Sequence, residues 1–118
     1  MSFEQKKDYV YAKTIGVYKE SEDFEKIEEL FINSKQYGYS TILVDIRDLN
    51  YNFDIPKRFF LSEYWVKLCK DLGYVTTAVL GNEEKMDRFS EDVISNRGVT
   101  FKLFTDEKKA VEWLKSFI

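Results

Sequence analysis

The residues best suited to chemistry form an acidic group before the middle of the chain, where Asp45 and Asp48 flank Ile46 and Arg47. Three more polar residues follow this group: Asn50, Asn52 and Asp54. Clustered carboxylates are typical ligands of hard divalent cations and of polar molecules. Asp and Asn also stabilise turns and helix caps, with Arg47 paired to Asp48 or Asp54. We favour this loop interpretation and keep a carboxylate-based metal or enzyme site at Asp45, Asp48 and Asp54 as the weaker alternative.

Other reactive groups are scarce in this chain. It has no histidine and one cysteine, which excludes Ser-His and Cys-His nucleophile pairs and His-ligated metals. We expect Cys69 to be a small buried apolar group. The turn at Gly81, Asn82 and Glu83 lacks the glycines and the lysine of a phosphate-binding loop. We therefore expect no catalytic residue, no metal and no cofactor.

Size and composition indicate one ordinary globular domain. The chain has 118 residues, of which 44% are hydrophobic and 33% charged, and its net charge is −3. A chain of this length can bury a sizeable core without metals or disulfides. The acidic balance argues against a nucleic-acid partner. No segment reads as a secretory signal or a membrane span, and a single cysteine suits a reducing compartment, so we expect a cytoplasmic protein.

Patterns of apolar residues predict alternating strands and helices. Strands are expected at residues 9–18, 41–46, 74–80 and 99–104. Helices are expected from Ser21 to Gly38, at 55–72, at 83–95, and after Thr105, which is assigned as the cap of the last helix. This alternation predicts parallel strands joined by right-handed helical crossovers. Residues 1–8 are expected to be a flexible N-terminus that precedes a single domain at 9–118.

The expected sheet brings the acidic group to one edge together with other polar residues. Asp45, Arg47 and Asp48 follow the second strand, Asn82 follows the third, and Asp54 precedes a helix. Ligands of open α/β sheets bind outside the carboxyl ends of the strands. These five residues are therefore our candidates for contact with a ligand or a partner.

The helix expected at 55–72 carries more apolar surface than a sheet alone can cover. One broad face runs from Phe60 to Leu72 at helical spacing. A second stripe consists of Ile55, Phe59, Ser62, Val66 and Cys69. Its neighbour can be an adjacent helix, a second copy of the chain in a homodimer, or an apolar ligand. Arg97, at the opposite edge of the sheet from the acidic group, is a further candidate for contact with a carboxylate or a partner.

The order and spacing of these stretches resemble a STAS domain of the SpoIIAA-like branch, which is also similar in shape to CRAL-TRIO lipid-binding domains. The resembling stretches are 16–18 (GVY), 42–48 (ILVDIRD), 78–82 (AVLGN), 96–99 (NRGV) and 104–107 (FTDE). The resemblance covers residues 9–117. It implies an α/β fold with a four- to five-stranded, mostly parallel sheet and four helices. It also implies a non-catalytic interaction or regulatory module that docks a protein partner.

Two departures from the family pattern matter. Regulatory members carry a phosphorylatable Ser or Thr after an Asp at the start of the helix that follows the central strand, whereas Ile55, Pro56 and Lys57 follow Asp54 here. We therefore expect a module without the phosphorylation switch. Members also often begin with an extra strand, for which residues 1–8 leave little room. The alternative function, suggested by an aromatic content of 17% and by the likeness to CRAL-TRIO domains, is binding of a small apolar molecule or a lipid.

Overall fold

The computed structural model describes residues 2–17, 23–38, 40–50, 55–73, 76–82 and 89–117. Its strands are β1 (Ser2–Gln5), β2 (Val10–Lys13), β3 (Gly16–Val17), β4 (Thr41–Asp45), β5 (Leu49–Asn50), β6 (Thr76–Leu80) and β7 (Phe101–Phe104). Its helices are α1 (Asp23–Gln36), α2 (Ile55–Leu72), α3 (Phe89–Ser95) and α4 (Glu107–Lys115).

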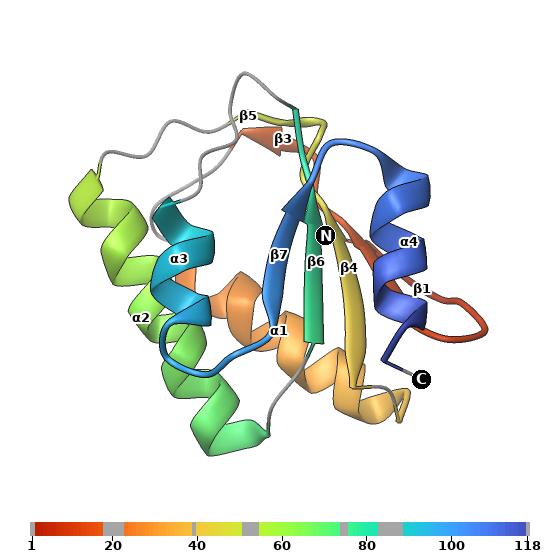
Figure 1. The fold of residues 1–118 in the computed structure, drawn as a ribbon, viewed down its shortest axis with the longest axis horizontal. Coiled ribbons are helices and arrows are strands. Elements are labelled where there is room, and N and C mark those ends of the chain that lie inside the picture. The colour runs from red at the N-terminus through yellow and green to blue at the C-terminus, as the bar shows by residue number, and fades with distance from the viewer. Residues whose placement is uncertain are drawn as a thin grey trace.

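The main sheet has five strands in the order β1-β2-β4-β6-β7. β1 pairs antiparallel with β2, and the other neighbours are parallel. Helices α1, α2 and α3 lie on one face of the sheet and α4 lies on the other (Figure 1). A small second sheet pairs β3 with β5 beyond the carboxyl end of β4. This architecture confirms the predicted α/β fold with a five-stranded, mostly parallel sheet and four helices.

The central strands are apolar because both of their faces are covered. Every residue of β4 is buried, and so is all of β6 after Thr76. A strand buried on both faces needs a continuous apolar run rather than an alternating one, and residues 42–44 (ILV) and 78–80 (AVL) are such runs. Helix α2 ends at Leu72, and the next residue, Gly73, has a φ of +112°, a backbone conformation that is strained for any side chain.

The two faces of the sheet enclose two separate clusters of buried residues. The first lies under α1, α2 and α3, and its centre is Trp65, whose ring meets Phe31 and Phe101 edge-on at centroid distances of 4.9 and 5.6 Å. The second lies under α4, where Ala110 and Leu114 are fully buried. Its members from the strands are Leu43, Ala78 and Leu80.

The N-terminal prediction is wrong. Residues 2–5 form β1, whose Phe3 packs against the first cluster, so this segment belongs to the domain. The sequence SFEQ is mostly polar and so does not look like a strand. It can form one because an edge strand is exposed on its outer side and on one face. The strand expected at 9–18 is divided into β2 and β3. The predicted cap Ser21 lies outside the described residues.

The predicted cap of the last helix is wrong by one residue. The side chain of Asp106, not that of Thr105, accepts hydrogen bonds from the backbone nitrogens of Lys108 and Lys109, at 2.9 and 3.4 Å. An aspartate at this position also stabilises the positive end of the helix.

Candidate functional site

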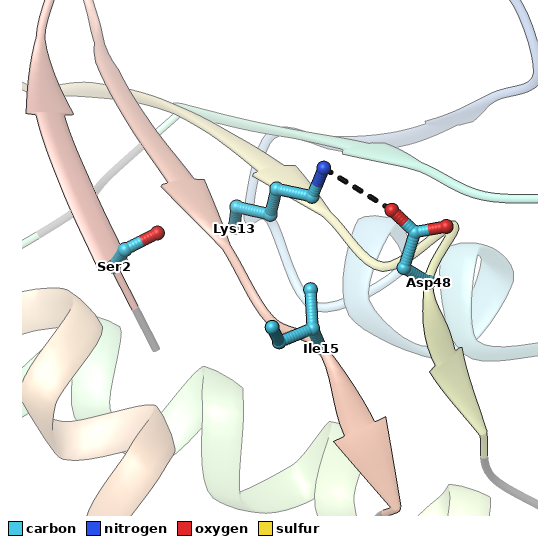
Figure 2. A pocket seen from close by; sticks show the side chains of 4 residues that line it. All are labelled: Ser2, Lys13, Ile15 and Asp48. Atoms are coloured by element: carbon cyan, nitrogen blue, oxygen red, sulfur yellow. Dashed lines mark ion pairs between the residues drawn. The ribbon is translucent and has the colours of Figure 1, made fainter.

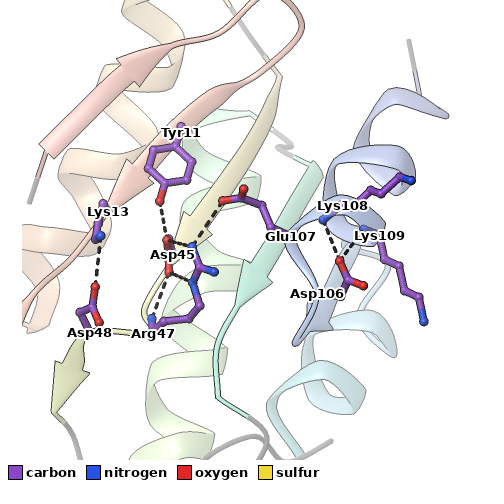
Figure 3. A network of polar contacts seen from close by, with 9 residues as sticks. All are labelled: Tyr11, Lys13, Asp45, Arg47, Asp48, Asp106, Glu107, Lys108 and Lys109. Carbon is purple, nitrogen blue, oxygen red and sulfur yellow. Dashed lines mark hydrogen bonds and ion pairs between the residues drawn. The ribbon is translucent and has the colours of Figure 1, made fainter.

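Asp45 is the centre of a polar network at the carboxyl end of β4 (Figure 3). Its side chain is fully buried, and both carboxylate oxygens accept hydrogen bonds. Arg47 donates from Nε to Oδ1 at 3.0 Å and from Nη2 to Oδ2 at 2.8 Å, and its backbone nitrogen donates to Oδ1 at 3.1 Å. The hydroxyl of Tyr11 donates to Oδ2. The bidentate arginine and the hydroxyl thus neutralise and hydrogen-bond the buried carboxylate.

These contacts keep Asp45 ionised. Burial alone would raise the pKa of Asp45, but the hydrogen bonds from Arg47 and Tyr11 outweigh it and lower the pKa from 3.8 to about 2. Burial and the hydrogen bond to Asp45 raise the pKa of Tyr11 to about 12. The hydrogen bond to Asp45 also raises the pKa of Arg47. All three groups therefore keep one protonation state near neutral pH, which argues against acid-base work by any of them.

Arg47 also joins the strand end to α4. Its Nη2 lies 3.4 Å from Oε1 of Glu107 in the first turn of that helix. Its backbone carbonyl accepts a hydrogen bond from Nδ2 of Asn82 at 2.7 Å. Of the two predicted partners of Arg47, Asp48 is not the one it contacts, because the short turn after β4 directs the guanidinium back onto Asp45, and Asp54 lies outside the described residues. Three of the candidate residues, Asp45, Arg47 and Asn82, therefore form one connected structure.

Asp48 belongs to a different contact. Its Oδ2 lies 3.1 Å from Nζ of Lys13 in β2, and both side chains are partly exposed to solvent. This ion pair borders an open pocket of about 670 Å³ that is also lined by Ser2 and Ile15 (Figure 2). Among the described residues that line it, Ile15 is apolar and Ser2, Lys13 and Asp48 are polar or charged. The apolar-ligand interpretation stays a prediction, and Asp54 lies outside the described residues.

Three residues of the second α2 stripe are part of the interior, and their neighbours are adjacent helices, one of the alternatives that the sequence left open; Phe59 is exposed, and the side chain of Ile55 lies outside the described part of the chain. Ser62, Val66 and Cys69 are buried, and Val66 and Cys69 belong to the first core cluster. The physical reason is that α2 contacts both α1 and α3 as well as covering the sheet, so its buried arc spans both predicted stripes. The buried position of Cys69 confirms the assignment of this residue as a small core group.

The exposed apolar surface of α2 lies near its first turn instead. Phe59 is 42% and Phe60 53% exposed. The guanidinium of Arg97, which follows α3, lies over the ring of Phe59 at 5.6 Å and 3.3 Å from Oε1 of Glu63. We call Phe59, Phe60, Glu63 and Arg97 the α2–α3 surface. The predicted contact of Arg97 with a carboxylate is confirmed.

Two members of the polar network have no counterpart among the predicted site residues. Tyr11 reaches Asp45 because β2 lies beside β4 with Lys13 and Asp45 in register, and Tyr11 is two residues before Lys13 on the same face. Glu107 reaches Arg47 because α4 begins beside the end of β4. The signal for Tyr11 was its place between two apolar residues of a strand, but it is informative only once the strand order is known.

Chemically, the network holds a charge in place rather than offering one to a substrate. No group of three or more Asp, Glu or Cys side chains that could hold a metal ion occurs within the described ranges. A metal or enzyme site built on Asp45 would need this carboxylate to give up Arg47 and Tyr11. No helix in the same ranges is long and apolar enough to cross a membrane.

Comparisons with known proteins identify the fold. No family model and no curated protein matches the sequence. A chain in the solved architecture of the stressosome, described as a signal integration and transduction hub, superposes with a TM-score of 0.59 at 17% identity, over 98% of this chain and 97% of that one. An uncharacterised protein of the DUF3478 family from Shewanella loihica PV-4, with a SpoIIAA-like fold, superposes with a TM-score of 0.57 at 23% identity, over 96% and 90%. The chain therefore has the SpoIIAA-like fold of STAS domains, as its sequence predicted.

Proposed function

We propose that this chain is a non-catalytic interaction module of the STAS type, which docks a protein partner on its α2–α3 surface. The observation that carries the proposal is the pair of exposed rings, Phe59 and Phe60, beside the Arg97 guanidinium. Aromatic and arginine side chains are the residue types that contribute most to protein interfaces. The stressosome chain with the same fold belongs to a signalling assembly, which supports a role in protein interaction.

The surface is also held in a defined shape before any partner arrives. Arg97 is fixed by Glu63 and by a 3.1 Å hydrogen bond from its Nη1 to the carbonyl of Val93. A side chain that is already held in place loses less conformational freedom on binding. This arrangement fits a partner that presents an apolar side chain to the two rings and polar groups to Arg97 and Glu63.

The start of α2 supports a module without a phosphorylation switch. Positions 55–57 carry no hydroxyl group. The first hydroxyl within α2 belongs to Ser62, which is buried against the core. A kinase would have to unfold the helix to reach it. Docking at the α2–α3 surface would then be controlled by the partner rather than by a phosphate on this helix.

A photo-crosslinking experiment tests the proposal. A photoreactive phenylalanine analogue is placed at Phe60 and, as a matched control, at Ile32 on α1, because both side chains are 53% exposed. In cells that make the protein, irradiation should yield one dominant protein adduct at position 60 and none of that mass at position 32. The captured partner is then purified and titrated with the parent chain by calorimetry.

The titration is repeated with two variants. Phe60→Asp should weaken binding by at least about tenfold, since it puts a charge where an apolar contact is made. Ile32→Asp should leave the affinity unchanged. Equal binding by the parent chain and by Phe60→Asp, or crosslinking that is the same at both positions, would contradict the proposal.

A further inference from the structure

The two edges of the main sheet are protected very differently. The outer side of β7 is covered by α3, where Glu91 Oε2 accepts from the backbone nitrogen of Leu103 at 2.8 Å and Ser95 Oγ donates to the carbonyl of Phe101 at 3.3 Å. β1 forms the other edge (Figure 1), and no strand pairs with its outer side within the described ranges. An edge strand of this kind is a template for pairing with another strand.

The backbone groups that β1 offers outward can be identified. Lys6 donates its backbone N–H to the carbonyl of Tyr9 at 2.9 Å, so this pair is a hydrogen-bonded one. Antiparallel pairs alternate between hydrogen-bonded and non-hydrogen-bonded. Gln5 and Phe3, which lie opposite Val10 and Ala12, therefore direct their N–H and C=O groups away from β2.

The charges along this edge are self-complementary: Glu4 lies in β1, and Lys6 directly follows the strand. Glu4 and Lys6 lie on the same face of the hairpin, with Nζ of Lys6 3.0 Å from Oε1 of Glu4. When two copies of β1 meet antiparallel with Gln5 opposite Gln5, each Glu4 faces the Lys6 of the other copy. Opposite charges at directly facing positions stabilise a strand pair and like charges destabilise it.

We propose that two copies of this chain associate through β1, in this register, to form one continuous ten-stranded sheet. The Gln5 pair exchanges two backbone hydrogen bonds, and Glu4 and Lys6 form two ion pairs across the seam. A register centred on Glu4 would place two carboxylates opposite each other, and one centred on Phe3 would set Glu4 against Ser2 with no opposing charge. The occupant is a second copy because the edge supplies both charges of each pair.

The seam is small, so the dimer is weak. β1 has four residues, far fewer than the 20 to 30 on each side of a typical stable interface. We expect a dissociation constant on the order of 1 mM. The chain should then be a monomer at about 1 µM and show a substantial dimer fraction at about 1 mM. Sedimentation velocity over this range measures the association constant directly.

Charge reversal on the full chain tests the register. Glu4→Lys and Lys6→Glu should each weaken self-association at least about tenfold, because each variant sets like charges opposite each other twice. An equimolar mixture of the two variants should form a heterodimer with at least the parental affinity. The double variant Glu4→Lys/Lys6→Glu, which retains the net charge of −3, should dimerise like the parent.

The possible results are distinct. A chain that stays monomeric at 1 mM, or a dimer that neither single reversal weakens, overturns the proposal. Failure of the mixture and of the double variant to restore association overturns the charge register. Phe60→Asp should not affect the dimer; if it does, the seam lies on the α2–α3 surface instead. Circular dichroism of each variant confirms that the fold is retained.

Discussion

The Asp45 carboxylate contributes to the stability of the fold by an amount that depends on pH. Because its pKa is lowered to about 2 from 3.8, the folded state gains stability above about pH 4, where the carboxylate is ionised. That gain is lost as pH falls from about 4 to about 2. The shift corresponds to about 2 kcal/mol of unfolding free energy. This side chain should thus be one of the groups that set the acid limit of the fold.

Replacing the carboxylate by an amide tests this role. Asp45→Asn should lower the free energy of unfolding at pH 7 by about 2 to 3 kcal/mol, because Arg47 and Tyr11 lose their charged acceptor. The loss relative to the parent should shrink at pH 3, because below about pH 3.8 the Asp45 carboxyl of the unfolded parent takes up a proton while that of the folded parent stays mostly ionised. Urea unfolding at both pH values measures it.

Asp48→Asn is the matched control for this experiment. Asp48 carries the same carboxyl group but pairs with Lys13 on the surface. An exposed ion pair contributes at most about 1 kcal/mol, so this variant should stay close to the parent at both pH values. If Asp45→Asn had the same free energy of unfolding as the parent, or if both substitutions lowered it equally, the structural role of Asp45 would be refuted.

The contact partners of single residues were the hardest feature to predict. Arg47 has carboxylates at positions 45, 48 and 54 within reach along the chain, and sequence distance does not choose among them. The choice is made by the turn after β4, in which Leu49 donates its N–H to the carbonyl of Ile46 at 3.1 Å. Tyr11 and Glu107 are brought in by strand order and helix placement, which are long-range features.

At the scale of elements, the helices show where periodicity is informative and where it misleads. The bounds 55–72 agree with α2 because a proline near the start and a glycine after the end mark them locally. Periodicity predicted two apolar stripes on α2 but could not choose the neighbour of the second, because it gives the direction of a face and not what packs against it. The packing of α1 and α3 against α2 is a tertiary contact, which the sequence of α2 alone does not reveal.

The start of α4 offers a direct comparison of sequence and structure. Asp106→Ala should lower the free energy of unfolding by about 1 kcal/mol, because the cap accepts from the first turn of the helix. Thr105→Ala, at the position that the sequence favoured, should change it by less than about 0.5 kcal/mol. Thermal or urea unfolding of the two variants checks both values. The reverse order would mean that Thr105 is the cap.

For the whole molecule, the fold was predictable because each signal is local and all of them agree. Apolar runs mark the central strands, polar and apolar residues alternate at helical spacing, and glycines follow the helices. The right-handed crossover rule then leaves few arrangements of the strands. β1 was not predicted because a short polar edge strand has no local sequence signal. It is a strand because it pairs with β2.

The boundary of the domain can be tested by removing β1. A chain without residues 1–5 should lose about 2 kcal/mol of unfolding free energy, because Phe3 leaves the first core cluster and the β1–β2 ladder is lost. Urea unfolding at low protein concentration measures this without interference from association. Glu4→Ala, which only shortens an exposed side chain, should stay within about 0.5 kcal/mol. An unchanged stability after truncation would restore the view of a flexible N-terminus.

The division of the core between two faces has a consequence for synthesis on the ribosome. α4 follows every strand in the chain, yet it alone supplies Ala110 and Leu114 to the second cluster. Until residues 107–115 pack on the sheet, the face that they cover stays apolar and exposed to water, although α1 and α2 can already pack on the opposite face. A newly made chain in this half-covered state would offer a chaperone an apolar surface to bind.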